Sequence, residues 1–534
     1  MSQELRALLA GALSLAVFLG WYYFFAPKAL PPPTQSLTER SLESPIQKPE
    51  SPTDFLQREK TSPEIVVSSL GNDLIQWEVS SYGGRIRKVL LNSYQQSVEK
   101  ESPPIDMILS GKEAGPLIVC RDCNFVLPPD ENYHLTTKTE RELVYEAKGE
   151  GFVLKKIFRF APDQYFFEVS AVMTNLSRDI LTGQLGFSWQ GTQKIQEKQG
   201  FFSFLKGPPD QRGFVYQIGG KLAHAGKKQE VIEERGNLSW IGLEDRYFLI
   251  ALINRKISSE SWGRLTSDAE LLTGTLYPGA FSIPRNGTNE ESFILYTGPK
   301  ERERLKMLGV GLEKAVDYGF FSIFAIPILK LLILFNSFLK NWGLAIIFLT
   351  ILVKLILNPL TVKSLKQMKE MQNLQPKLKE IREKYQNDKQ RLNLETMQLF
   401  KNHKVNPLGG CLPMLIQMPL YIALYKVLYN SIELYHAPFF GFYRDLSAPD
   451  PYLILPVLLG IFMVLQQKMT PSGSADPAQR QMMMFMPILF TGFMLFLPLG
   501  LVLYIFVNTF MSVAQQFMYQ RNLKVRDLPH LFKK

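Results

Sequence analysis

The stretch WGLAIIFLTILVKLILNP, residues 342–359, decides the fold, because Lys354 is its only charged residue. As a helix this run would be about 27 Å long, close to the thickness of the hydrocarbon core of a bilayer. Five other runs have similar length and character. They are Ala7–Ala26, Cys411–Ser431, Tyr452–Gln467, Met482–Pro498 and Gly500–Met518. These runs predict a polytopic α-helical membrane protein with six transmembrane helices.

A long region of different character lies between the first two runs. Residues 64–300 contain short β-rich segments separated by turn residues, such as KKIFRFAPDQYFFEVSAV around a Pro-Asp turn. This pattern predicts a large all-β sandwich. Residues 28–63, rich in Pro, Ser, Gln and Glu, predict an extended linker after an N-terminal anchor at 1–27.

The segment before residue 342 is apolar but is not counted as a span. Val316–Lys340 contains Pro327, Lys330 and Asn336, and only Lys340 and Asn341 separate it from the next run. Two antiparallel spans need a longer turn. We therefore expect residues 301–340 to form connecting and interfacial amphipathic helices, and 341–520 to form a five-helix core.

Positive charge sets the expected orientation. Basic residues are concentrated in 361–405, in the connection at Lys468 and Arg480, and in the tail 521–534. By the positive-inside rule these segments are cytoplasmic, which places both termini in the cytoplasm and the β domain in the periplasm. The formal net charge of +11 then faces the anionic inner leaflet, so nucleic-acid binding is not needed to explain it.

The basic segment 361–405 is expected to form a cytoplasmic hairpin. Met371, Leu374, Leu378, Ile381 and Tyr385 recur at spacings of three and four, as on one face of a helix. Pro376 should kink that helix or loosen its packing there, and Asn387-Asp388 should end it and cap a second one. The hairpin is either a solvated connector or a mobile arm that meets nascent chains, ribosomes or targeting factors.

Polar side chains repeat every fourth residue in three of the apolar runs. They are Thr350, Lys354 and Asn358 in one run, Gln417, Tyr421 and Tyr425 in another, and Tyr504, Asn508 and Ser512 in the last. Residues at this spacing share a helix face, so the three stripes predict a hydrated cavity. Alternatives are that Lys354 snorkels to the headgroups and that the other side chains form interhelical hydrogen bonds. Gln467, the last residue of the run 452–467, is also a candidate for this groove.

Methionines gather in two of the runs, where they could contact varied apolar segments. We single out Met414 and Met418 in one run and Met483 and Met486 in another as a candidate hydrophobic slide. The alternative is ordinary packing or lipid contact.

Chemical motifs of enzymes are absent from the sequence. It contains no phosphate-binding loop, nucleophile elbow or His-Glu-x-x-His motif, so we expect neither an enzyme nor a cofactor. Cys120 and Cys123 lack a second Cys pair or a His cluster that would complete a zinc site. They are expected to form a structural disulfide or to remain two unreactive thiols.

Several of these segments resemble the YidC insertases, the bacterial members of a family that also includes the mitochondrial oxidase-assembly insertase. The likeness lies in KVNPLGGCLPMLIQMPLYIALYKVL (404–428), NWGLAIIFLTILVKLILNPLT (341–361), DLSAPDPYLILPVLLG (445–460) and GLVLYIFVN (500–508). It implies a periplasmic β-supersandwich and five core helices around a hydrophilic groove. It also implies insertion of nascent membrane proteins into the inner membrane, alone or with the Sec translocon.

Three positions depart from the family pattern, and one of them is Lys426 in the run 411–431. The groove charge, usually Arg, is Lys354, which lacks the bidentate fork of a guanidinium. The position beside Tyr504, where the family often has an aromatic residue, is Ile505 here.

Two other readings compete with the insertase. One is a small-solute or proton-coupled transporter that uses Lys354. Transporters usually contain internal repeats, and the absence of a repeat among the apolar runs argues against this reading. The other is a sugar-binding or sugar-isomerising β domain, for which no convincing set of His and carboxylate residues is found.

Overall fold

The computed structural model describes ten ranges of the chain, and the following description refers to them. They are residues 65–108, 115–192, 213–225, 230–255, 260–267, 271–386, 388–403, 405, 412–470 and 477–521. The expected anchor, the linker and the basic tail beyond residue 521 lie outside these ranges. The side chains of Met414 and Met483 also lie outside the description.

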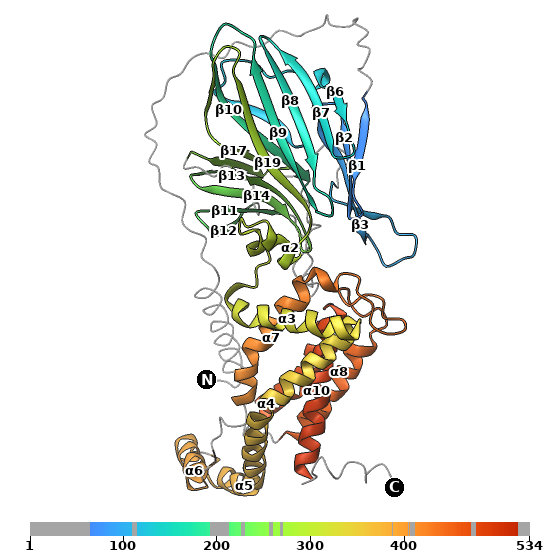
Figure 1. Cartoon of the computed structure of the whole chain (residues 1–534). Helices are drawn as coiled ribbons and strands as arrows, with labels where there is room; N and C mark the ends of the chain where they lie inside the picture. The colour runs from blue at the N-terminus through green and yellow to red at the C-terminus, as the bar shows by residue number, and fades with distance from the viewer. Residues whose placement is uncertain are drawn as a thin grey trace, which may run out of the picture. The chain divides into compact units, whose positions relative to one another are not determined.

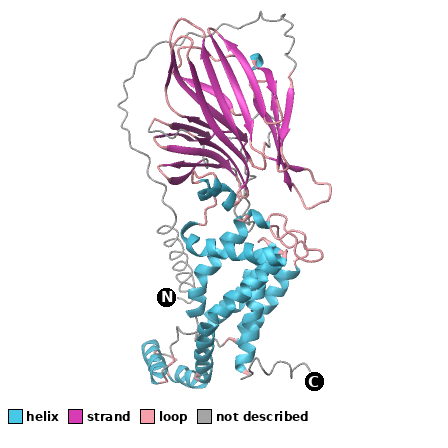
Figure 2. Ribbon diagram, in the orientation of Figure 1, coloured by secondary structure: helices cyan, strands magenta, loops and turns pink. Residues whose placement is uncertain are grey.

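The first part of the described chain is all β, in three antiparallel sheets (Figures 1 and 2). Four strands form the order β1-β2-β3-β4, six form β13-β16-β17-β10-β18 with β5 beside β10, and nine form β12-β11-β14-β15-β19-β9-β8-β7-β6. The strands are β1 (Val67–Gly71), β2 (Ile75–Ser80), β3 (Arg85–Gln95), β4 (Pro104–Asp106), β5 (Leu117–Arg121), β6 (His134–Lys138), β7 (Glu142–Gly149), β8 (Phe152–Phe160), β9 (Phe166–Asn175), β10 (Leu181–Thr192), β11 (Gly213–Ile218), β12 (Lys221–Ala225), β13 (Glu230–Arg235), β14 (Leu238–Glu244), β15 (Phe248–Asn254), β16 (Trp262–Ser267), β17 (Leu271–Tyr277), β18 (Phe281–Ile283) and β19 (Thr288–Pro299), with a short 3-10 helix η1 (Asp130–Asn132).

Alternating side chains build the core between these sheets. In β8 and β9 every second residue is buried, as the pleat of a half-buried strand requires, and these residues are apolar apart from Lys156 and Asn175. Phe187 of the six-stranded sheet meets Phe293 of the nine-stranded sheet, with ring centroids 4.5 Å apart. Trp77 of the small sheet packs edge-on against Phe167, 5.2 Å away. The expected β sandwich is therefore present.

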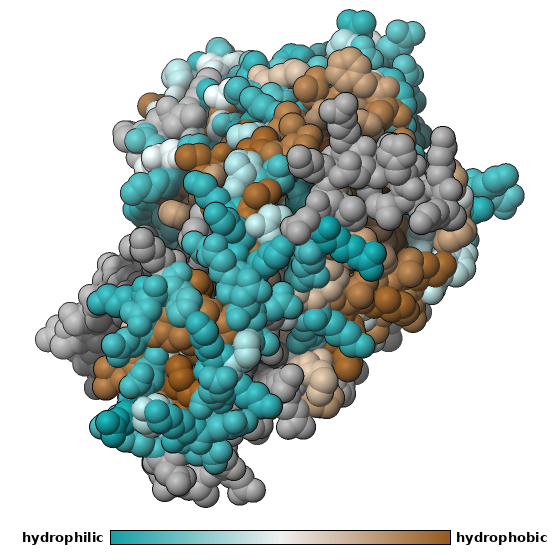
Figure 3. All heavy atoms as spheres, turned by 90° about the horizontal axis from the view of Figure 1, so that it is seen from below, coloured by the Kyte–Doolittle hydropathy of each residue, from teal (hydrophilic) through white to brown (hydrophobic). Residues whose placement is uncertain are grey.

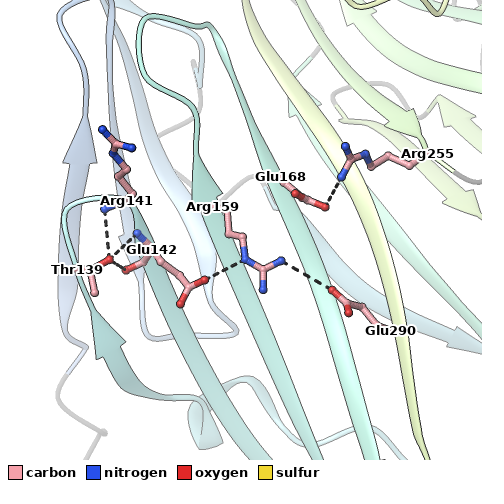
Figure 4. A network of polar contacts seen from close by, with 7 residues as sticks. All are labelled: Thr139, Arg141, Glu142, Arg159, Glu168, Arg255 and Glu290. Atoms are coloured by element: carbon pink, nitrogen blue, oxygen red, sulfur yellow. Dashed lines mark hydrogen bonds and ion pairs between the residues drawn. The ribbon is translucent and has the colours of Figure 1, made fainter.

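The exposed face of the nine-stranded sheet carries a ladder of charges (Figure 4). Arg159 lies opposite Glu142 on one side and Glu168 on the other. It pairs with Glu142 at 3.0 Å and with Glu290 at 3.9 Å, and Arg255 pairs with Glu168 at 2.6 Å. These pairs are open to solvent, so each contributes little to stability.

Cys120 and Cys123 form a disulfide at the end of β5. Of the two expectations for this pair, the structural disulfide is the one found. Asp122 between them adopts a left-handed backbone conformation with φ of 54°, which turns the chain tightly enough to bring the two sulfurs together. Cys123 also lies directly over Gly183, where a side chain would collide with the sulfur.

The second part of the described chain is helical (Figure 2). It contains α2 (Arg302–Met307), η3 (Leu312–Ala315), η4 (Gly319–Phe321), α3 (Ser322–Leu339), α4 (Trp342–Asn373), α5 (Gln375–Lys384), α6 (Lys389–Asn402), α7 (Leu412–Asn430), η6 (Ile432–Leu434), α8 (Ile454–Met469), α9 (Pro477–Met494) and α10 (Leu499–Gln520). α10 packs against α4 and α8, and α3 packs against α4 and α7.

Three described helical stretches are long and apolar enough to cross a membrane. They are Gly319–Leu339, Trp342–Asn373 and Leu499–Gln520, and Ile454–Met469 and Met484–Met494 are shorter apolar helices. The stretch containing α3 thus meets the same criterion as the two expected spans. In Figure 1, α3 runs across the direction of α4 and α10, and Lys340 and Asn341 form a tight corner between α3 and α4. Its interfacial assignment remains a prediction.

The helix boundaries differ from expectation around the basic segment. α4 does not end near Pro359 but continues to Asn373 with that proline inside it. The prediction of one helix carrying Met371 through Tyr385 was wrong, because the chain breaks at Leu374 and a new helix begins with Pro376 in its first turn. Proline lacks the N–H that a helix interior needs and is well tolerated at a helix start. Asp388 caps α6 by accepting from the Arg391 amide at 3.0 Å, as expected.

Candidate functional site

Lys354 is buried where α4 meets α10, with 5% of its surface exposed. Its ammonium donates a hydrogen bond of 2.6 Å to the Ser512 hydroxyl. Ser512 in turn donates to the carbonyl of Asn508, one turn earlier in α10, at 2.8 Å. The polar stripes expected on these two helices therefore face each other, and the lysine lies within the bundle.

Asn508 is the point at which α10 meets α7. Its side-chain oxygen accepts from the Gln417 amide at 3.2 Å, and its own amide donates to the Tyr421 hydroxyl. Tyr421 packs edge-on against Tyr504, with ring centroids 5.7 Å apart. Asn508 and Tyr504 are both buried. Four of the expected site residues are thus brought together by contacts between two helices.

The other two residues of the α4 stripe behave differently from Lys354. Thr350 is fully buried, and its hydroxyl donates to the carbonyl of Ile346 in the same helix at 2.7 Å. Asn358 is exposed, and its oxygen accepts from the Gln515 amide of α10 at 3.3 Å. Equal spacing placed these residues on one side of α4, but only Lys354 turns a charged group into the bundle.

The polar stripe of α10 extends further than the residues selected from the sequence. Gln516 is buried and donates to the Thr470 hydroxyl just after α8, at 3.4 Å. Gln520 donates to the Met469 carbonyl at 2.9 Å. The signal was available, since Asn508, Ser512, Gln516 and Gln520 continue the same four-residue spacing. Gln467 lies half-buried in the last turn of α8, near this end of the stripe.

Comparison with known proteins accounts for both parts of the chain. Residues 334–526 match the family model described as 60Kd inner membrane protein, and residues 68–331 match that of the YidC periplasmic domain. The membrane protein insertase YidC of Syntrophus aciditrophicus is 35% identical over 559 residues, covering 96% of this chain and 98% of that protein. That of Magnetococcus marinus is 34% identical over 513 residues, covering 93% of this chain and 89% of that protein.

The chain belongs to the YidC family of membrane protein insertases. It is accordingly a multi-pass protein of the inner membrane with a periplasmic β domain. The resemblance drawn from the core segments is confirmed, and the transporter reading is not favoured.

Solved structures resemble the chain more distantly. A crystal structure of an active YidC insertase with its first transmembrane domain resolved is 17% identical, with a TM-score of 0.36, and covers 85% of this chain and 94% of that one. A putative aldose 1-epimerase from Escherichia coli K12 is 10% identical, with a TM-score of 0.31, and covers 44% and 99%. Likeness at this level says nothing about a sugar-directed activity of the insertase.

The electrostatics of the insertase core centre on Lys354. Among the described residues, no carboxylate forms an ion pair with its ammonium, and its hydrogen-bond acceptor Ser512 is neutral. A neutral acceptor stabilises the ammonium without cancelling its charge. Within the same described ranges, no group of three His, Cys, Asp or Glu side chains is placed to hold a metal ion.

Apolar surface surrounds this polar centre on the outside of the helices. Met418 of α7 and Met486 of α9 are about half exposed, at 52% and 48%. An open apolar groove of about 370 Å³ runs between α8 and α9, lined by residues including Val457, Ile461, Val464, Pro487 and Ile488. Seen from the helical end, apolar residues form several patches on the surface, with hydrophilic residues between them (Figure 3). The candidate site therefore joins a polar interior to an apolar exterior.

Proposed function

We propose that the insertase works through a hydrophilic groove whose centre is Lys354. The observation that carries the proposal is the buried ammonium of Lys354 on the neutral hydroxyl of Ser512, 2.6 Å away. A cation in the membrane region costs several kcal/mol unless water or a partner attends it, so such residues usually serve a function. An acidic group on an entering chain would supply the missing negative charge.

The proposed sequence of events uses the two surfaces described above. Lys354 attracts acidic residues of a short segment that is to be translocated, which shortens the distance that this segment crosses in lipid. Thr350, Asn358, Gln417, Gln467, Tyr504 and Asn508 line or support the polar path. The hydrophobic segment then moves along the methionine-bearing helices α7 and α9, through Met414, Met418, Met483 and Met486. Burial of apolar surface in lipid, worth about 25 cal/mol per Å², drives the final step.

The proposal includes a topology and partners. Six spans, with α3 in the interface, place both termini and the segment 361–405 in the cytoplasm. α5 and α6 within that segment carry several exposed basic side chains and the exposed apolar residues Leu394 and Met397, suited to ribosomes, targeting factors or emerging chains. The proposed partners also include the lipid bilayer and the Sec translocon, with which the insertase acts when it does not act alone.

Insertion of a single-span substrate with an acidic translocated tail into proteoliposomes tests the groove. The wild type is compared with Lys354→Arg and Lys354→Ala, each with the acidic tail and with the same tail neutralised to Asn and Gln. Arg is expected to preserve insertion of the acidic substrate, and Ala to reduce it strongly while affecting the neutral substrate less. Equal insertion of both substrates by wild type and Lys354→Ala would exclude charge attraction and leave Lys354 as a snorkelling residue.

A further inference from the structure

A side chain of the β domain contacts the end of a helix that forms the groove. Arg246 lies in the turn between β14 and β15, and its Nε donates to the carbonyl of Tyr429 in the last turn of α7 at 2.7 Å. Its guanidinium also lies over the Tyr429 ring, 3.5 Å from the centroid, and over the Tyr247 ring at 4.6 Å. One arginine is thus held between two aromatic rings while it binds the helix backbone.

This contact acts on the helix at the point where it most needs a partner. The last four carbonyls of a helix have no N–H donor within the helix, and they lie at the negative end of its dipole. A cation placed there neutralises the dipole and satisfies an otherwise unpaired carbonyl. The stacked tyrosine adds a cation–π interaction. Arg246 therefore functions as a cap for α7 that comes from a different part of the chain.

The turn that carries Arg246 is itself held firmly. The Asp245 carboxylate accepts from the amides of Tyr247 and Phe248 at 3.0 and 2.7 Å. Glu244, one residue earlier, pairs with Lys300 at 2.8 Å and with His224 at 3.0 Å. The turn is thereby tied to the end of β19, from which the chain leaves the β domain. The Arg246 side chain therefore keeps a fixed position relative to the β domain, and so does the end of α7 that it binds.

The far end of the same helix face reaches the groove. Gln417, Tyr421, Tyr425 and Tyr429 follow one another at intervals of four residues along α7. The rings of Tyr425 and Tyr429 stack, with centroids 5.5 Å apart. Tyr421 and Gln417, about 12 and 18 Å from Tyr429 along the helix, are the residues that meet Asn508.

We propose that Arg246 is a positioning residue for the groove. By holding the last turn of α7, it determines where the tyrosine column of this helix stands relative to Asn508 on α10. The β domain then contributes to insertion through one turn, residues 244–247, without touching the substrate. This inference rests on the proposed use of the groove for its functional consequence, although the capping of α7 can be measured separately.

The test combines hydrogen–deuterium exchange of the full chain in lipid nanodiscs with insertion assays. Arg246→Ala, Arg246→Lys and Tyr429→Leu are compared with Arg255→Ala, which changes an exposed arginine directly after β15 that pairs with Glu168. Arg246→Ala is expected to speed exchange of the amides at residues 426–434 by roughly tenfold, with β14 and β15 unchanged. Its insertion rate should fall several-fold for acidic and neutralised tails alike, with Arg246→Lys and Tyr429→Leu intermediate and Arg255→Ala normal.

Two results would overturn the inference. Unchanged exchange at the end of α7 in Arg246→Ala would show that the arginine does not hold the helix. Faster exchange with normal insertion would show that the cap is structural only. If Arg246→Ala also loosened β14 and β15, the milder Tyr429→Leu and Arg246→Lys variants would decide. Failure of the charge-attraction step would appear instead as insensitivity to Lys354→Ala, with the exchange result unaffected.

Discussion

The ammonium of Lys354 in α4 donates a 2.6 Å hydrogen bond to the hydroxyl of Ser512 in α10. The pair joins the two helices through a charged donor and a neutral acceptor. A lysine ammonium has three donors, so this bond leaves capacity for a further acceptor from a passing chain. The net positive charge of the site is retained, which distinguishes the pair from a closed ion pair.

Replacing the neutral acceptor by an anion should disable this site. Ser512→Asp is expected to bind the Lys354 ammonium as an ion pair and reduce insertion of a substrate with an acidic tail by about tenfold or more. The Asn side chain in Ser512→Asn has nearly the same size as that of Asp but carries no charge, so this variant should insert the substrate at the normal rate. The measurement is the initial rate of insertion into proteoliposomes. Equal rates for the Asp and Asn variants would show that the free charge of Lys354 is not used.

Asn508 should be the polar residue of the bundle that is most costly to remove. Asn508→Ala leaves the Gln417 amide and the Tyr421 hydroxyl without their partner, at a cost of about 1–3 kcal/mol for each buried group. Asn358→Ala removes an exposed contact to Gln515 and should cost far less. Unfolding of purified protein in detergent, followed by fluorescence or by a melting assay, compares the two. Similar midpoints would mean that water takes over the role of Asn508.

Glu433 of η6, after the end of α7, should make stability depend on pH. Burial raises the pKa of its carboxyl to about 7, and Glu301 adds to the rise, with Tyr318 and Tyr94 also nearby. An acid whose pKa is raised on folding favours the folded state below its unfolded pKa, near 4.5, and loses that contribution as the pH rises through 7. Glu433→Gln should therefore match wild type at pH 5 and be more stable at pH 8.

Melting temperatures of both proteins across this pH range provide the measurement. Glu433→Asp, which keeps the carboxyl, is the matched control and should retain the pH dependence of wild type. A constant difference between Glu433→Gln and wild type at all pH values would contradict the assignment, because it would show that ionisation of Glu433 is not involved.

The Cys120–Cys123 disulfide closes a short loop and should stabilise the β domain modestly. A loop of this length predicts a loss of about 2 kcal/mol when the bond is removed, on the entropic account. The double variant Cys120→Ser, Cys123→Ser is expected to lower the midpoint of denaturant unfolding while insertion at low temperature stays normal. The reduced wild type should behave like the double variant. A large loss of insertion in the variant, but not in the reduced protein, would point to a role for the side chains themselves.

Much of the site could be read from spacing within single helices. Lys354, Gln417, Tyr421, Tyr504 and Asn508 were selected because they repeat at four-residue intervals, and the structure brings them together. The same spacing continues to Gln516 and Gln520, which extend the Asn508 stripe but were not selected from the sequence. It also could not separate Lys354, which is buried, from Asn358, which is exposed, since periodicity places both on one face.

Local sequence determined the class of this protein. Apolar runs are long enough to cross a membrane, an alternating pattern indicates the β sandwich, and capping residues and prolines mark the ends of short helices such as α6. These depend on interactions between residues close in the chain or on the solvent that each run requires. Tertiary structure alone decided that α4 runs through Pro359, that Ser512 receives the Lys354 ammonium, and that Arg246 caps α7 from 183 residues away. Such contacts depend on how separate elements pack, and no periodicity within one element encodes its partner.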